Sequence, residues 1–147
     1  MDITSPAFSN DEYIPETYAR KGDNMSPPLE FANVPHGTAS LALVCHDPDA
    51  PGAEGWTHWV VWNIPPDAGG FEQGEIPDGA VQGTTDRNEN KWGGPLPPSG
   101  THRYIFYLYA LNTELDLPNT TTRNDLEHAM QGHVLETATL TGLFSAE

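Results

Sequence analysis

Four acidic and imidazole side chains in this sequence stand at the ends of apolar segments, where folding could bring them together. Asp47 and Asp49 directly follow one apolar run, and His58 and His102 each stand near the start of a later one. If the first two runs pair as antiparallel strands, the turn between them places His58 close to the two aspartates. We therefore expect the four side chains to meet at one rim of a sheet.

The residue types in this group suit the capture of a phosphate-like anion. Strand alternation puts His102 and Tyr104 on one face of their segment, and Trp56 and His58 on one face of theirs. Imidazole and phenol groups supply hydrogen-bond donors, and bonds to a charged acceptor are about twice as strong as neutral ones. Gly94 lets its backbone N–H approach an oxyanion because it carries no Cβ. We expect phosphate to bind more tightly as the pH falls from about 8 to about 6, because protonated imidazoles add donors.

The two carboxylates need a different role, because they repel an ionised phosphate. Asp47 and Asp49 can fix the histidine tautomers, raise the pKa of the imidazoles or meet an amine on the ligand. A zwitterionic head group such as phosphoethanolamine would use both signs of charge.

Other interpretations of the same residues stay open. His58 and His102 can each be structural, and the two aspartates around Pro48 can be turn residues that cap backbone amides. A hydrolase or isomerase could use the histidines as acid and base with Asp47 as orienter, and two histidines with two aspartates could hold a metal ion. Because the sequence contains no nucleophile elbow, phosphate loop or dinucleotide fingerprint, we expect a binding protein without catalysis, cofactor or metal.

Apolar runs separated by proline and glycine predict a mainly β fold, with two antiparallel sheets packed as a sandwich and one or two short helices. The strongest strand signals cover 40–46, 56–64 and 102–111, and weaker ones cover 3–8, 29–31, 80–83 and 134–144. Period-two alternation groups Trp56, His58, Val60 and Trp62 on one face, and Val134, Ala138, Leu140, Gly142 and Phe144 on another. One helix is expected over 123–131, with Thr122 and Asp125 as a capping pair. A single domain covers 1–147.

The charge balance excludes two classes of partner. The chain carries 21 Asp and Glu against six Lys and Arg, a net charge of −15, which repels nucleic acid and anionic membrane surfaces. Such a load suits a salt-rich, halophilic cytoplasm, where self-repulsion is screened. We expect no integral membrane association, because no stretch approaches the roughly 20 apolar residues of a span, and no signal peptide is recognisable. Cys45, the single cysteine, is expected to be a buried small hydrophobe.

Several motifs together resemble the phosphatidylethanolamine-binding protein family, which includes the Raf kinase inhibitor proteins. The similarity runs through nearly the whole chain and ends in a pattern typical of the compact prokaryotic and archaeal branch. The motifs are I-P-E-T-Y from Ile14, G-D-N-M-S-P-P-L from Gly22, D-P-D-A-P from Asp47, W-T-H-W-V from Trp56, G-G-P-L-P-P-S-G-T-H-R-Y from Gly93 and A-M-Q-G-H-V-L from Ala129.

The resemblance implies a surface pocket that accepts phosphate, acetate or phosphorylated head groups. By motif position the pocket residues would be Asp47, Asp49, Trp56, His58, Gly94, His102 and Tyr104. It also implies a cis peptide at Ala50–Pro51, a homodimer, and a regulatory or inhibitory role towards a protein partner. The segment 83–92 departs from the family pattern, with Trp92 in place of the usual tyrosine, and Thr57 replaces a second histidine of the animal members.

Overall fold

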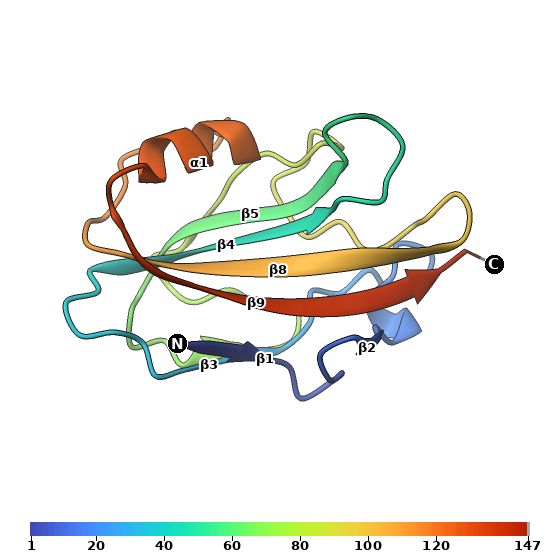
Figure 1. The fold of residues 1–147 in the computed structure, drawn as a ribbon, viewed down its shortest axis with the longest axis horizontal. Helices are drawn as coiled ribbons and strands as arrows, with labels where there is room; N and C mark the ends of the chain where they lie inside the picture. The colour runs from blue at the N-terminus through green and yellow to red at the C-terminus, as the bar shows by residue number, and fades with distance from the viewer. Residues whose placement is uncertain (147) are drawn as a thin grey trace.

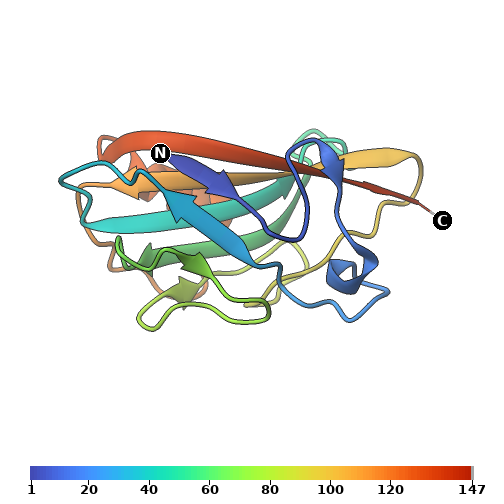
Figure 2. The same ribbon diagram turned by 90° about the horizontal axis from the view of Figure 1, so that it is seen from below.

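The computed structural model of the protein describes residues 1–146, which form two β-sheets and one α-helix. In Figure 1 the large sheet lies between the helix α1 above it and the strands β1 and β3 below it, and Figure 2 shows the small sheet in front of the large one. The small sheet has the order β1-β3-β6 and the large one β2-β9-β8-β4-β5-β7. The strands are β1 (Asp2–Thr4), β2 (Glu12–Tyr13), β3 (Leu29–Ala32), β4 (Ser40–Asp47), β5 (Trp56–Ile64), β6 (Gly70–Phe71), β7 (Val81–Gln82), β8 (Thr101–Leu111) and β9 (Val134–Ser145).

The predicted sandwich of mainly antiparallel strands is confirmed. All three strong strand signals correspond to strands, and β4 pairs antiparallel with both β5 and β8. Of the weaker signals, the segment 3–8 is strand only at its start, in β1. The two-residue strands β2 and β6 were not predicted, and β2 pairs in parallel with β9. A two-residue strand leaves no readable periodicity in a sequence, which is why both escaped prediction.

Strand alternation produces two separate hydrophobic layers on the large sheet. Leu43 and Cys45 of β4 face the small sheet and belong to the core between the two sheets. Ala42 and Val44 face the opposite way and pack beneath α1. Cys45 is fully buried, as predicted, and burial raises the pKa of its thiol.

The helix α1 (Arg123–Met130) begins and packs as the sequence predicts. The side chain of Thr122 accepts a hydrogen bond from the backbone N–H of Asp125, at 3.5 Å between nitrogen and oxygen. Such a cap satisfies one of the free N–H groups at the helix start. Leu126 and Met130 are buried and attach the helix to the large sheet.

The predicted faces of β9 are confirmed except at its start. Ala138 and Leu140 pack on the core between the sheets, and Thr139 is exposed. Val134 is exposed and does not join the face that packs on the core. The register with β8 shifts next to this residue, and the irregularity breaks the alternation.

The turn after β4 differs from the expectation in one peptide bond. The Ala50–Pro51 peptide bond is trans, so the implied cis bond is wrong. The chain reverses there through Gly52 and Gly55, whose φ angles of 106° and 66° suit glycine and complete the turn without a cis bond.

Within residues 1–146 we find no helix whose length and hydrophobicity would allow it to cross a bilayer.

Candidate functional site

A β-bulge between β4 and β5 decides which way His58 points. Cys45 pairs with Trp59, but the next residue of β4, His46, pairs with Thr57, so His58 is an extra residue in β5. An extra residue of this kind interrupts the alternation of faces along its strand.

The bulge turns His58 towards the side of the sheet that faces the small sheet. Its ring packs edge-on against Tyr104, with 5.1 Å between ring centroids, and Tyr104 belongs to the core between the sheets. Val60 and Trp62 lie on the other side, beneath α1. The prediction that His58 shares a face with these two residues is therefore wrong.

A cavity of about 270 Å³ lies at the rim of the large sheet, where β4 ends and β5 and β8 begin. Strand residues, two proline-rich loops and the loop after β7 build its walls. The lining residues are Asp47, Ala50, Pro51, Trp56, His58, Arg87, Leu96, Pro97, Pro98 and Tyr104. Four of the seven residues expected from the sequence are thus brought together: Asp47, Trp56, His58 and Tyr104.

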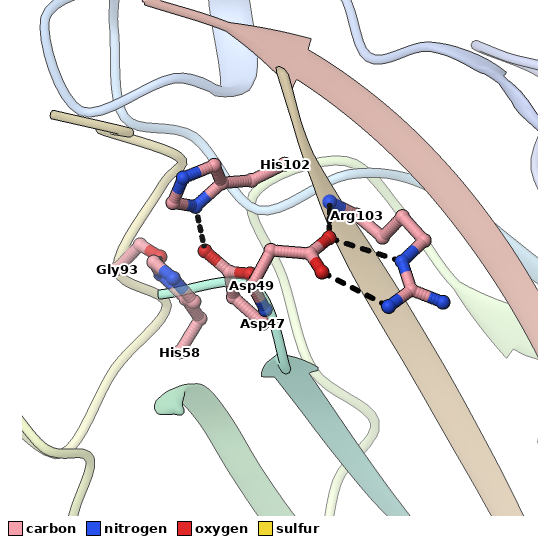
Figure 3. Close-up of polar contacts among 6 residues, drawn as sticks. All are labelled: Asp47, Asp49, His58, Gly93, His102 and Arg103. Carbon is pink, nitrogen blue, oxygen red and sulfur yellow. Dashed lines mark hydrogen bonds and ion pairs between the residues drawn. The ribbon is translucent and has the colours of Figure 1, made fainter. Parts of the chain in front are cut away.

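Asp47 is the buried carboxylate of this cavity and orients two neighbours. Its Oδ2 lies 2.6 Å from Nδ1 of His102, as Figure 3 shows, and its Oδ1 accepts the backbone N–H of Asp49 at 2.8 Å. A carboxylate only accepts hydrogen bonds, so Nδ1 of His102 carries the hydrogen. His102 is therefore tied to the site through Asp47, but it does not line the cavity itself.

The structure places Asp49 and Gly94 outside the cavity lining. The carboxylate of Asp49 turns towards Arg103 and forms a two-pronged ion pair, with distances of 2.9 and 3.0 Å to the guanidinium. This hydrogen-bonded guanidinium lowers the pKa of Asp49 to about 2. The backbone N–H of Gly94 is also engaged, because it donates to the side-chain oxygen of Asn24 at 2.7 Å. A Cβ at Gly94 would overlap the carbonyl of Tyr18, so close packing is one reason for glycine here.

The His58 ring has a defined tautomer. Its Nδ1 lies 2.6 Å from the carbonyl oxygen of Gly93, and the backbone N–H of Gly93 donates in turn to the His58 carbonyl at 3.0 Å. Burial lowers the pKa of His58 to about 4, although the Gly93 carbonyl and Asp47 act in the opposite direction. His58 consequently does not gain a proton between pH 8 and pH 6, contrary to the expectation from the sequence.

Tyr104 and Trp56 supply the aromatic surface of the cavity. The Tyr104 hydroxyl is enclosed and has no hydrogen-bond partner among the described residues. Burial, together with the nearby Asp47 carboxylate, raises the pKa of this phenol, so the hydroxyl stays protonated and can donate. Trp56 is 37% exposed and pairs with Asp47 across the two strands.

Arg87 is the charged lining residue that the sequence did not reveal. It lies in the segment 83–92, which departs from the family pattern, and it makes no ion pair or hydrogen bond with any residue in 1–146. A single arginine in a polar loop has no pattern that predicts a site. Trp92 of the same segment is buried in the core, where it stacks on Phe106, and does not touch the rim.

The metal hypothesis needs two histidines and two aspartates around one point. Among residues 1–146, no group of three or more His, Cys, Asp or Glu side chains is arranged to hold an ion. The Asp49 carboxylate in particular is bound by Arg103.

These features define a class of two-sheet β proteins with a small polar pocket at the rim of the larger sheet. The sequence matches the family described as phosphatidylethanolamine-binding protein over residues 4–145, and the chain belongs to this family.

Its relatives include archaeal and bacterial proteins of the same size. A UPF0098 protein of Methanothermobacter thermautotrophicus is 49% identical over 149 residues, with 98% of each chain covered. A putative phosphatidylethanolamine-binding protein homolog of Chlamydia trachomatis has a similar crystal structure, with a TM-score of 0.95 at 38% identity, covering 99% of this chain and 97% of that one. YbcL of E. coli, described as a new member of the mammalian family, has a TM-score of 0.94 at 30% identity and covers 99% and 98%. The chain is thus similar to the prokaryotic and archaeal members.

Proposed function

We propose that the pocket at the rim of the large sheet binds small oxyanions, namely phosphate or phosphorylated small molecules with head groups such as phosphoethanolamine. The observation that carries this proposal is Arg87, a cation that lines the cavity without an ion pair among the described residues. Family membership supports the same conclusion, because the family is described as phosphatidylethanolamine-binding protein, and phosphatidylethanolamine carries a phosphate group.

The unpaired arginine is significant because the protein as a whole repels anions. With a net charge of −15, an anion reaches the surface only where a local cation outweighs the field of the carboxylates. Four of the six Lys and Arg residues are already engaged in ion pairs with Asp or Glu. These are Arg20, Lys91, Arg103 and Arg123.

A larger cavity, of about 810 Å³, lies against the small sheet but does not suit an anion. Its lining contains five carboxylates and no lysine, arginine or histidine. The carboxylates are Glu30, Asp67, Glu72, Glu75 and Asp78. Charge therefore favours the smaller pocket.

Asp47 gives the smaller pocket its second polar function. It lines the same cavity as Arg87 and keeps acceptor capacity after bonding to His102 and to the amide of Asp49. An ammonium group on the ligand can approach this carboxylate while the phosphate approaches the guanidinium. The proposal therefore extends to zwitterionic phosphoethanolamine.

Isothermal calorimetry with inorganic phosphate tests the proposal on the wild-type chain and on Arg87→Gln. We expect Arg87→Gln to weaken binding about ten-fold, because a hydrogen bond to a charged group is lost. Lys91→Gln is the matched control, because it removes the same charge from a solvent-exposed residue in another cavity. Equal weakening of phosphate binding in both variants would show that only the net charge of the protein matters, and not the position of Arg87. Absence of phosphate binding by the wild type would refute the proposal.

Three further expectations belong with this proposal. The homodimer and the regulatory role towards a protein partner are predictions from the family resemblance. The cytoplasmic location is a prediction from the sequence.

A further inference from the structure

The hydrogen bond between His58 and Gly93 fixes what the imidazole can offer a ligand. A backbone carbonyl only accepts hydrogen bonds, so Nδ1 of His58 carries the ring's hydrogen. Because burial lowers the pKa of this ring to about 4, it is neutral at pH values above about 5. A neutral imidazole with hydrogen on Nδ1 has a bare Nε2, which is an acceptor.

The bare Nε2 of His58 is open to the cavity. It makes no hydrogen bond to any described residue, yet it is not one of the enclosed unpartnered atoms, which are the Trp62 indole nitrogen and the Tyr104 hydroxyl. Because the His58 ring lines the cavity and is otherwise buried, the cavity is where this nitrogen is accessible.

The other charged or titratable groups around His58 come from each neighbouring element. Asp47 of β4 and Tyr104 of β8 line the same cavity, and Arg87 enters from the loop after β7. His102 of β8 is held by Asp47, and His46 of β4 lies on the opposite face of the sheet. The cavity thus presents one cation and two acceptors, the Nε2 of His58 and the Asp47 carboxylate.

We infer that this pocket selects oxyanions that carry an acidic hydrogen, such as the monoanion of a phosphate monoester, over oxyanions of equal charge that carry none, such as a sulfate monoester. The inference rests on the proposed function and specifies the class of ligand. The P–OH group donates its hydrogen to Nε2 of His58, while the ionised oxygens accept from the guanidinium of Arg87. No covalent bond is made or broken.

A ligand without this hydrogen pairs poorly with the same wall. It turns an oxygen lone pair towards the lone pair of Nε2 and leaves a largely buried acceptor unpaired. Sites built to hydrogen-bond a ligand group reject analogues that lack it, and a single unpaired buried group reduces affinity about ten-fold or more.

Calorimetry with methyl phosphate and methyl sulfate tests the inference. At a pH of about 5.5 both ligands are largely monoanions of nearly the same shape, because the second pKa of a phosphate ester is about 6. We expect methyl phosphate to bind the wild-type protein at least about ten-fold more tightly than methyl sulfate.

The pH dependence of the two ligands gives a second readout. Between a pH of about 5.5 and about 8, methyl phosphate loses its hydrogen and gains a negative charge. We expect its affinity to fall over this range while that of methyl sulfate stays constant. A site that responds to charge alone would bind the dianion more tightly, so a rise in methyl phosphate affinity would overturn the inference.

His58→Leu assigns the effect to the imidazole, because leucine removes the acceptor and keeps an apolar side chain. We expect the preference for methyl phosphate to shrink to about three-fold or less, with the fold of the variant checked by circular dichroism. Full preference in this variant would exclude His58 as its source. Equal binding of both ligands to the wild type would refute the inference and leave the proposed function standing, whereas failure of phosphate itself to bind would refute the proposed function.

Discussion

The hydroxyl of Tyr104 is enclosed by the fold and has no hydrogen-bond partner among the described residues. An unpaired buried polar group destabilises a protein by about 1–3 kcal/mol. Binding sites tolerate such groups because a ligand, or a small movement on binding, can supply the partner. Tyr104 lies in the wall of the proposed pocket, so ligand binding would explain why the fold tolerates the destabilisation caused by this unpaired hydroxyl.

We predict that Tyr104→Phe raises the free energy of unfolding of the ligand-free protein by about 1 kcal/mol, because the unpaired hydroxyl is removed. Urea denaturation with and without phosphate measures the effect, and the gain should shrink when phosphate is present. Tyr107→Phe is the control, because Tyr107 is a partly buried tyrosine elsewhere on β8. A Tyr104→Phe variant that is less stable than the wild type would contradict the prediction.

Single residues show how far the sequence could specify the site. The meeting of Asp47 with His102 was predictable, because both stand at ends of strong apolar strands. The engagement of Asp49 by Arg103 was not, because the ion pair joins residues 54 positions apart and either partner could have found another. Arg87 could not be assigned to the pocket, because it lies in a polar loop whose sequence has no periodic pattern from which its position could be predicted.

At the scale of elements, consecutive residues on three segments divide between the two faces of the sheet. Asp47, His58 and Arg87 line the pocket. Their preceding neighbours, His46, Thr57 and Asp86, are joined to one another on the other side. The Nδ1 of His46 lies 2.9 Å from the Thr57 hydroxyl oxygen, and Asp86 accepts the Thr57 backbone N–H at 2.7 Å.

The contact between Asp86 and Thr57 attaches the Arg87 loop to β5. The backbone N–H of Asp86 also donates to the Thr57 carbonyl, at 3.2 Å. These two hydrogen bonds hold the backbone immediately before Arg87, although Asp86 itself does not line the pocket. Asp86 is thus a positioning residue for the guanidinium.

We predict that Asp86→Ala weakens phosphate binding about three- to ten-fold, because the Arg87 loop loses its side-chain anchor. Charge alone predicts the opposite, since the substitution removes a carboxylate beside the proposed anion site. Calorimetry on Asp86→Ala and on Asp78→Ala, an exposed aspartate elsewhere, separates the two effects. Tighter binding by Asp86→Ala would show that the carboxylate acts through its charge and not as an anchor.

The β-bulge explains why sequence periodicity predicted the strands well but placed His58 wrongly. Hydrophobic periodicity reports where a strand lies, and the three long strands carry strong signals. A bulge adds one residue and shifts every face assignment beyond it, and no residue of the W-T-H-W-V segment signals this shift. The position of His58 in the cavity wall is therefore a property of strand pairing, which only the folded structure shows.

At the scale of the whole molecule, the net charge of −15 concerns stability as well as the proposed binding of anions. Carboxylates distributed over a small surface repel one another and destabilise the compact state. The described residues contain few cations to offset them, and several of these are bound in local ion pairs. The same repulsion makes the unpaired Arg87 the distinctive feature of the pocket.

We predict that the thermal unfolding midpoint rises by about 5 °C or more when sodium chloride is raised from about 0.01 M to about 1 M. The screening length falls from about 30 Å to about 3 Å over this range, so repulsion between distant carboxylates is removed while short ion pairs lose less. Circular dichroism at constant pH measures the midpoint, and potassium chloride should act equally because screening does not depend on the cation. Sucrose at matched osmolarity is the control for excluded-solute effects. An unchanged or lower midpoint in salt would show that surface repulsion does not limit the stability of this protein, and would remove the physical basis for a halophilic origin of its composition.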